Sequence, residues 1–233
     1  MDEVNMSGFE MQIIARIKSD FPEKFGIPRQ SGIVDELGAT VIFEKAFRSP
    51  EALRGIEGFS HLWLIWQFSE NIRDGWSPTV RPPRLGGNER LGVFATRSPF
   101  RPNPIGLSCV KLLGVEQTEK YGPVLHIGGA DLMDGTPVYD IKPYLPYTDC
   151  KPQATGGFAP GSEDYRVKVE IPETLINIIP ENKRSALFGV LSQDPRPAYK
   201  EDGDRVYGMR FAGFNIKFTV SGGVLTVTQI EKE

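Results

Sequence analysis

The sequence predicts a mainly β chain, in which an all-β N-terminal domain precedes a small α+β C-terminal domain. Its 233 residues include 19 prolines and 25 glycines, a content that suits short strands and turns better than a helical bundle. Over the first 150 residues, short apolar runs alternate with turn signals, which favours a barrel or sandwich over a doubly wound sheet. Residues 148–164 are rich in Gly, Pro, Ser, Ala and Gln, which indicates a linker. We therefore divide the chain into domains 1–150 and 151–233.

The N-terminal domain is expected to consist of short strands. The clearest one is residues 58–68, where alternate side chains form two faces that are both largely apolar. This pattern indicates a strand that is buried on both sides or that closes a barrel. Residues 50–55 suggest one helical turn, and residues 72–89 are expected to be irregular because they are rich in Pro, Gly and Arg. The expected strands are residues 11–17, 40–43, 58–68, 91–96, 105–113, 124–128 and 138–142.

The C-terminal domain is expected to combine a helical segment with strands. Residues 172–193 are predicted to be mostly helical with an interruption at Pro180, because Glu181 directly after a proline suits the start of a helix. Residues 221–223 (Ser-Gly-Gly) separate two apolar runs and are a hairpin signal. The expected strands are residues 165–171, 206–211, 214–220 and 224–230.

A loop at residues 92–106 carries three prolines between two expected strands. Proline fixes φ and removes a backbone donor, so these residues cannot lie inside a helix or a central strand. The loop is therefore stiff, and it holds Arg97 and Arg101 in place. Planar guanidinium groups on a stiff loop suit anions or carboxylates. The alternative is a surface turn with two solvated arginines.

Positive charge is concentrated in one window of an otherwise acidic chain. The whole chain has a net charge of −3, whereas residues 73–111 hold seven basic and two acidic side chains. This window has a net charge of +5, which suits a local polyanion such as an RNA backbone. The alternative is a solvated face.

Absent motifs disfavour several classes of protein. The chain has no G-x-G-x-x-G between a strand and a helix, no G-x-x-x-x-G-K-[ST] and no G-x-S-x-G. It has two cysteines and two histidines, which do not form a four-ligand set, so we expect no metal and no disulfide framework. No signal peptide and no membrane-spanning apolar run is visible. We therefore expect a cytoplasmic protein without a membrane partner.

Several motifs gain meaning when they are taken together. They are residues 28–30 (PRQ), 58–63 (GFSHLW), 81–87 (RPPRLGG), 92–98 (GVFATRS), 134–137 (DGTP), 140–144 (DIKPY) and 194–199 (DPRPAY). The set resembles the TsaA-like (YaeB/TrmO) family of bacterial tRNA (N6-threonylcarbamoyladenosine) N6-methyltransferases. The resemblance extends from about residue 13 to residue 199 with few gaps.

The resemblance implies a single β-barrel in the N-terminal domain that binds S-adenosylmethionine, followed by the small α+β C-terminal domain. It implies a tRNA substrate, methylated on the modified adenosine directly 3′ of the anticodon, and it implies a homodimer. By matching position, it also implies a set of cofactor-binding residues. They are Pro28, Arg29, Gln30, His61, Leu62, Arg97, Leu107, Asp131, Leu132, Met133 and Asp134.

The chemistry of S-adenosylmethionine agrees with these residues independently of the family. Its carboxylate suits an arginine fork, which Arg97 or Arg29 supplies. Its ammonium group or ribose suits carboxylates, which Asp131 and Asp134 supply, and no metal is needed. Two residues have plainer alternatives. His61 lies in an apolar strand and suits a core histidine, and Asp134 precedes a glycine and suits a turn.

Catalysis and RNA binding involve further residues. A carbamoyl group delocalises the lone pair of the acceptor nitrogen, so we expect a side chain to accept its proton. Asp194 and Tyr199 are the candidates, because they lie in a polar motif directly after the expected helix. The residues expected to contact the RNA are Arg81, Arg84, Arg90, Arg101 and Arg196. Arg101 has the alternative of facing the cofactor pocket.

Two other functions remain open from the sequence. A non-catalytic RNA-binding barrel would use the same basic window, but it would not bind S-adenosylmethionine. A small-molecule methyltransferase would use its C-terminal domain only to support the dimer, and it would leave tRNA unmethylated.

Overall fold

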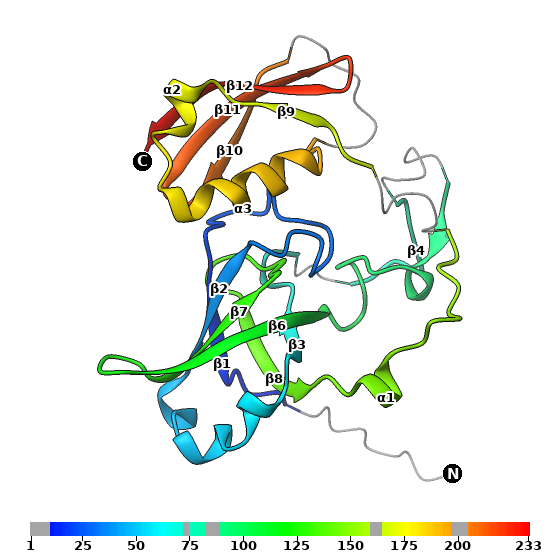
Figure 1. Ribbon diagram of the computed structural model, residues 1–233. Coiled ribbons are helices and arrows are strands. Elements are labelled where there is room, and N and C mark those ends of the chain that lie inside the picture. Colours follow the sequence, from blue (N-terminus) through cyan, green and yellow to red (C-terminus); the bar gives the residue numbers. More distant parts are fainter. Residues whose placement is uncertain (1–9, 72–74, 83–88, 159–164, 197–204) are drawn as a thin grey trace.

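Strands dominate the computed structural model, which describes residues 10–71, 75–82, 89–158, 165–196 and 205–233 (Figure 1). The main N-terminal strands are β1 (Ala15–Lys18), β2 (Gly38–Phe43), β3 (His61–Gln67), β6 (Ile105–Thr118), β7 (Gly122–Gly128) and β8 (Pro137–Pro143). They pair in the order β1-β2-β7-β6-β3-β8 and form a closed barrel. All pairings around the ring are antiparallel.

Alternation of side chains along each strand builds the core of the barrel. In β3, Leu62, Leu64 and Trp66 are buried, whereas the residues between them are partly exposed. The strand expected at residues 58–68 is therefore confirmed for residues 61–67, whereas Gly58 ends a 3-10 helix. Only one of its faces is fully buried, because the other looks outward from the barrel. In β6 the same alternation leaves an outer face that is exposed, for example at Leu107.

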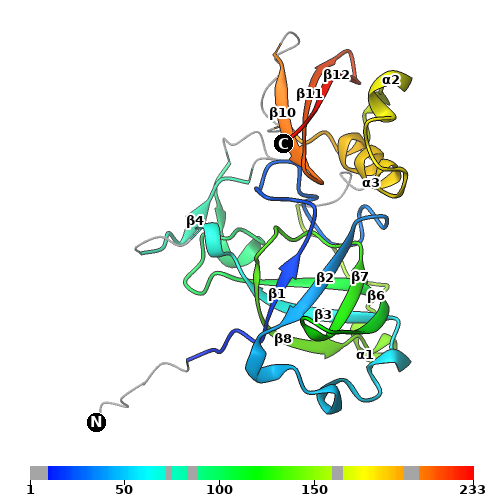
Figure 2. The ribbon, with the colours of Figure 1, turned by 90° about the vertical axis from the view of Figure 1, so that its left-hand side faces the viewer.

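A two-stranded ribbon projects from the side of the barrel (Figures 1 and 2). It consists of β4 (Thr79–Val80) and β5 (Leu91–Gly92), which pair antiparallel. The sequence predicts an irregular segment over residues 72–89, and β4 is a correction to that expectation. A strand of two residues is too short to produce a detectable alternation of side chains.

The strand expected at residues 91–96 is correct only for its first two residues. After Gly92 the backbone turns into a 3-10 helix, Val93–Ala95. Thr96 fixes this turn, because its backbone N–H and its hydroxyl both donate to the carbonyl of Val93, at 3.2 and 2.9 Å. The turn directs the chain from the ribbon into the proline-rich loop.

Short helical turns occupy several connections of the N-terminal half. The turn expected at residues 50–55 is present as the 3-10 helix Pro50–Leu53, which begins with a proline, as helices often do. After β8 the chain forms α1 (Pro146–Asp149), which overlaps the start of the expected linker. Further 3-10 helices are Lys45–Phe47, Ile56–Gly58 and Ser69–Asn71.

The C-terminal domain pairs two helices with a four-stranded sheet. Pro180 is the N-cap residue of the longer helix, which confirms the expected interruption. The helices are α2 (Glu173–Ile176) and α3 (Glu181–Ser192), and the strands are β9 (Lys168–Glu170), β10 (Tyr207–Phe211), β11 (Phe214–Ser221) and β12 (Val224–Lys232). The sheet order is β10-β11-β12-β9, with β9 parallel to β12. The prediction of a mainly β chain with a small α+β C-terminal domain is confirmed.

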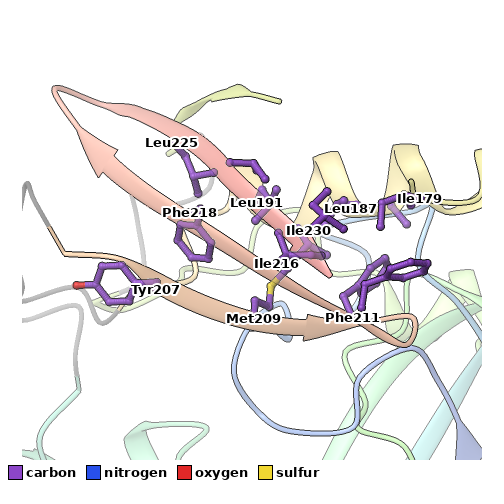
Figure 3. Close-up of a cluster of buried hydrophobic side chains, with 14 of the residues drawn as sticks. Ile179, Leu187, Leu191, Tyr207, Met209, Phe211, Ile216, Phe218, Leu225 and Ile230 are labelled. Atoms are coloured by element: carbon purple, nitrogen blue, oxygen red, sulfur yellow. The ribbon is translucent and has the colours of Figure 1, made fainter. Parts of the chain in front are cut away.

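The β1–β2 loop and the C-terminal domain share a hydrophobic core, which is separate from the core of the barrel. Figure 3 shows side chains of α3 facing those of β10, β11 and β12. Phe21 and Val34, from the loop between β1 and β2, belong to the same buried cluster. A Cβ at Gly189 would lie 2.5 Å from Val34 Cγ1, and one at Gly26, where φ is +94°, would overlap the side chain of Met209. Glycine at these two positions lets the C-terminal domain hold the β1–β2 loop tightly.

Candidate functional site

A cavity of about 870 Å³ opens beside the C-terminal end of β3 and the start of β6. Its walls come from four segments that are distant in the chain: the β1–β2 loop, the end of β3, the proline-rich loop and the turn before β8. Its volume lies within the range of about 300–1,000 Å³ that is typical of small-ligand sites. One wall, the β1–β2 loop, is the segment held by the C-terminal domain.

Most of the residues that the sequence predicts for cofactor binding meet at this cavity. Arg101 lines it too, so the structure favours the pocket-facing alternative for this arginine. The predicted residues that line the cavity are Pro28, Arg29, Gln30, Arg97, Leu107, Asp131 and Met133. Closure of the barrel is what brings these segments together.

The proline-rich loop holds two guanidinium groups at the cavity. Arg97 Nη1 donates to the side-chain oxygen of Gln30, which joins this loop to the β1–β2 loop. Arg101 Nη1 donates to the backbone carbonyl of Thr96 at 3.1 Å. Both arginines are thus fixed by hydrogen bonds, as expected for cationic groups on a stiff loop.

Asp131 is the carboxylate of the cavity. Its Oδ1 accepts the hydroxyl of Ser108 at 2.6 Å, and Ser108 Oγ accepts the indole N–H of Trp66 at 2.9 Å. Burial raises the pKa of Asp131, and the hydrogen bond from Ser108 and the charge of Arg97 offset only part of that rise. A carboxylate and a guanidinium group therefore line the same cavity.

Three predicted cofactor residues from the barrel core and its turn lie away from the cavity. Leu62 and Leu132 are buried in the barrel core. Asp134 holds the turn before β8: its carboxylate accepts the backbone N–H of Ser19 at 3.0 Å and pairs with Lys18 Nζ at 3.1 Å. Asp134 thus has the geometry of the turn-forming alternative.

His61 lies at the opposite end of β3 from the cavity. It lies six positions before Gln67, which lines the cavity, so the two are about 20 Å apart along the strand. Its Nδ1 lies 2.9 Å from Ser60 Oγ, and its ring meets Tyr144 edge-on at 6.2 Å between centroids. The side chain is partly exposed, so it is not a core histidine.

The predicted proton acceptor Asp194 lies directly after α3 and does not line the cavity. Its φ of +50° is the left-handed conformation that commonly ends a helix. Arg196 donates to both carboxylate oxygens at 2.8 Å, and the hydroxyl of Tyr165 donates at 3.2 Å. Burial raises the pKa of Asp194, but the hydrogen bonds and charge of Arg196 outweigh it and hold this pKa below its usual range. Tyr199 lies outside the described residues.

The arginines predicted to bind RNA fall into different environments. Arg81 and Arg90 are exposed, directly after β4 and directly before β5. Arg196 is only 14% exposed and is engaged by Asp194, so its guanidinium group is committed within the protein. Arg84 lies outside the described residues.

The sequence analysis did not predict several residues of the site, among them Trp66, which lines the cavity, and Ser108, which links Trp66 to Asp131. A signal for Ser108 was present, because it occupies an inward position of β6 between Gly106 and Val110. A buried hydroxyl on an apolar face requires hydrogen-bond partners, and these are Trp66 and Asp131. The partners themselves are distant in sequence, so only the fold identifies them.

Three further observations bear on metals, membranes and thiols. Among the residues that the structure describes, no cluster of three or more His, Cys, Asp or Glu side chains is arranged to hold a metal ion. Within the same part of the chain, no helix is both long and apolar enough to cross a membrane. Cys109 and Cys150 are free thiols.

The closed barrel and its cavity define a small-ligand-binding β protein, whose site suits a ligand with both an anionic and a cationic group. The chain belongs to the tRNA-methyltransferase O family. Residues 16–150 match the N-terminal domain of that family and residues 166–233 match its C-terminal domain. The family membership inferred from the sequence motifs is confirmed.

Similar proteins extend over nearly the whole chain. A tRNA (adenine(37)-N6)-methyltransferase of Escherichia coli (strain K12) is 42% identical over 234 residues, which cover 97% of this chain and 99% of that protein. A putative S-adenosylmethionine-dependent methyltransferase, RcsF, of Pseudomonas aeruginosa is 44% identical over 208 residues, which cover 84% and 86%. The crystal structure of TrmO from Pseudomonas aeruginosa superimposes with a TM-score of 0.78 at 33% identity, covering 96% of this chain and 99% of that one.

Proposed function

We propose that the protein is an S-adenosylmethionine-dependent tRNA methyltransferase, which methylates N6 of threonylcarbamoyladenosine directly 3′ of the anticodon. The observation that carries the proposal is the meeting of Arg97 and Asp131 at one cavity, in a chain whose full-length relative is named for methylation of adenine 37 in tRNA. The N-terminal domain, residues 1–150, binds the cofactor, and residues 151–233 form the linker and the C-terminal domain. A tRNA substrate also supports a cytoplasmic location.

The residues at the cavity fit S-adenosylmethionine. Arg97 and Arg29 offer guanidinium donors to its carboxylate, and Asp131 offers an acceptor to its ammonium group or ribose. Ile27 and Leu107 provide apolar walls for the remainder. When bound, the cofactor supplies a methyl group on a positively charged sulfur. The protein's own work is to align the acceptor nitrogen, to exclude water and to receive a proton.

The identity of the proton acceptor is open between two regions. Asp194 and Tyr199 stay the prediction from the sequence motif. Asp131 is the alternative, because it lies in the cavity and its raised pKa makes it a stronger proton acceptor than an ordinary carboxylate. Single-turnover rates of Asp131→Asn, Asp194→Asn and Tyr199→Phe, each saturated with cofactor, distinguish these candidates.

A homodimer is part of the proposal. Apolar side chains are exposed on the outer face of β6: Ile105 by 37%, Leu107 by 54% and Leu113 by 58%. A second copy packed against this face would cover them, and two of them, Ile105 and Leu107, also line the cavity.

Light scattering of Leu113→Asp tests the dimer, because Leu113 does not line the cavity. We expect the variant to be monomeric and to bind the cofactor more weakly than the wild type. A monomeric variant with undiminished cofactor binding would show that one protomer contains the whole site.

The decisive experiment for the activity is mass spectrometry of nucleosides from tRNA treated with the protein and S-adenosylmethionine. We expect a methyl gain on threonylcarbamoyladenosine and none on an unmodified transcript. Cofactor binding by calorimetry without any methyl gain on tRNA would favour a small-molecule methyltransferase. Absence of cofactor binding would favour a non-catalytic RNA-binding barrel.

A further inference from the structure

Two large aromatic side chains are exposed together at one end of the β4–β5 ribbon. Trp76 is 52% exposed and Phe94 is 71% exposed, and their rings lie 6.0 Å apart between centroids with an interplanar angle of 30°. The ladder explains their proximity, because the backbone N–H of Val93 donates to the carbonyl of Pro78 at 2.9 Å and extends the pairing beyond β4 and β5. Aromatic side chains of this size are normally buried, so an exposed pair marks a binding surface.

The aromatic pair adjoins the cavity. Phe94 lies in the 3-10 turn that Thr96 closes, and both Thr96 and Arg97 line the cavity. Phe94 lies three positions before Arg97, which limits the distance between their Cα atoms to about 11 Å. Phe94, and with it the ring of Trp76, therefore lies close to one wall of the cavity.

Cationic side chains lie at the other end of the same ribbon, after β4 and before β5. Arg81 and Arg90 flank it and are exposed, and Arg90 Nε donates to Thr79 Oγ1 at 2.9 Å, which aligns this guanidinium group with the strand. Arg101 lies at the cavity. Aromatic faces interleaved with arginines are the usual surface for single-stranded nucleic acid, where bases stack and phosphates pair with cations. The charge of this surface is local, since the whole chain has a net charge of −3.

We propose that Trp76 and Phe94 form a stacking platform for unpaired bases of the RNA loop that carries the target adenosine. The inference rests on the proposed function, because it takes a tRNA loop as the substrate. A base that enters the cavity leaves its neighbours without a stacking partner. The two rings replace that partner, and the flanking arginines hold the adjoining phosphates. Trp76 and Phe94 thereby position the substrate and do not contact the reacting atoms.

The test compares Trp76→Ala, Phe94→Ala and the conservative Phe94→Trp with a control variant, Phe188→Ala. Phe188 is also an exposed phenylalanine, 45% exposed, but it lies on α3 in the C-terminal domain. The probe is an RNA hairpin with an anticodon-type loop that carries 2-aminopurine, whose fluorescence reports stacking. Affinity for the hairpin, affinity for S-adenosylmethionine, kcat and KM are measured for each variant.

We expect each alanine variant of the ribbon to bind the hairpin about 5- to 100-fold more weakly, the range that loss of one base–aromatic stack produces. The KM for tRNA should rise by a similar factor, with kcat and cofactor affinity unchanged. Phe94→Trp should restore binding, and Phe188→Ala should behave as the wild type.

Three outcomes would overturn the platform. The first is an unchanged hairpin affinity in both alanine variants, and the second is an unchanged fluorescence of 2-aminopurine. The third is a molecular mass of the alanine variants that is half that of the wild type, which would assign the aromatic pair to contact with a second copy of the chain. Failure of the proposed function looks different. In that case the wild type transfers no methyl group to tRNA, while the loss of hairpin affinity in the alanine variants still supports the platform.

Discussion

Asp131 and Asp194 occupy contrasting environments, although the family resemblance points to both, Asp131 by matching position and Asp194 as part of the motif 194–199. Asp131 lies at the barrel cavity, hydrogen-bonded to Ser108, and burial raises its pKa. Asp194 ends α3 in the C-terminal domain, and Arg196 binds both of its oxygens and keeps its pKa low. The first carboxylate keeps capacity for a ligand or a proton. The second is already neutralised by a partner two residues away.

The two carboxylates differ in where their hydrogen-bonding and charged partners come from. This origin distinguishes a candidate binding group from a structural ion pair. For Asp194 the guanidinium group is local and fixes a helix end. For Asp131 the partners Ser108 and Arg97 come from β6 and the proline-rich loop, and they converge only because the barrel closes. Substitutions in the two regions should therefore affect different quantities, ligand binding in one and stability in the other.

The largest expected effect is on cofactor binding in Arg97→Ala. In the proposed complex, removal of this guanidinium group takes a charged partner from the cofactor carboxylate, which typically costs about 2–5 kcal/mol in a desolvated site. Calorimetry should show S-adenosylmethionine affinity at least about 30-fold weaker, with an unchanged melting temperature. Arg54→Ala is the matched control, since Arg54 is a surface arginine paired only with Glu51 among the described contacts. Equal affinities of the two variants would remove Arg97 from the site.

The next largest effect is the stability loss in Asp194→Asn. Asparagine tolerates a φ of +50° and keeps an acceptor for Tyr165, so the substitution removes mainly the charge. Arg196 would remain largely buried without its counter-charge, and the free energy of unfolding should fall by about 3 kcal/mol. Urea denaturation measures the loss, and calorimetry should find cofactor affinity within about twofold of the wild type. A fall in single-turnover rate without a loss of stability would instead support Asp194 as the proton acceptor.

Gly106→Ala is expected to have a smaller effect on both cofactor binding and stability. A Cβ at this position would lie 2.2 Å from the ring of Trp66, which lines the cavity and donates to Ser108. The ring has to move, which should cost about 1–3 kcal/mol of stability and weaken cofactor binding. Gly114→Ala on the same strand is the control, because its Cβ meets no atom within 4 Å. Melting temperatures and calorimetry of the pair tell whether the Trp66–Ser108–Asp131 arrangement supports the site.

The sequence contains much of the fold and part of the site, for identifiable reasons. Regular alternation predicts β3, and Pro180 predicts the start of α3, because these signals are local. β4 escapes prediction because two residues show no period. The turn after Gly92 escapes it because it depends on the hydroxyl of Thr96.

In the site, too, local signals are predictable from the sequence, whereas contacts between distant segments are not. Arg97 is predicted as a cavity residue from its stiff loop, whereas Ser108 requires knowledge of its partners across the barrel. Motif matching also cannot separate Asp134, which holds a turn, from Asp131, which faces the cavity, because the two lie three residues apart. Only the folded barrel shows which of the two carboxylates lines the cavity and which one holds the turn.

The smallest expected effect, and the most direct test of the contrast, is the sign of the pH dependence of stability. A native pKa below the unfolded value means that Asp194 stabilises the protein above its unfolded pKa and loses this contribution as the pH falls through its native pKa. A native pKa above the unfolded value means that Asp131 contributes fully below its unfolded pKa and loses this contribution as the pH rises through its native pKa.

Acid melting curves should therefore diverge in opposite directions for the two asparagine variants. We compare the unfolding free energy of the wild type with that of each variant as the pH falls from 7 toward the acid range. The difference between the wild type and Asp194→Asn should decrease. The difference between the wild type and Asp131→Asn should increase. The total change for each carboxylate is limited to about 1.4 kcal/mol per unit of difference between its native and unfolded pKa, so denaturant titrations at several pH values are needed to resolve it. Slopes of the same sign would mean that the two carboxylates share one kind of environment, and the division between a binding carboxylate and a structural one would fail.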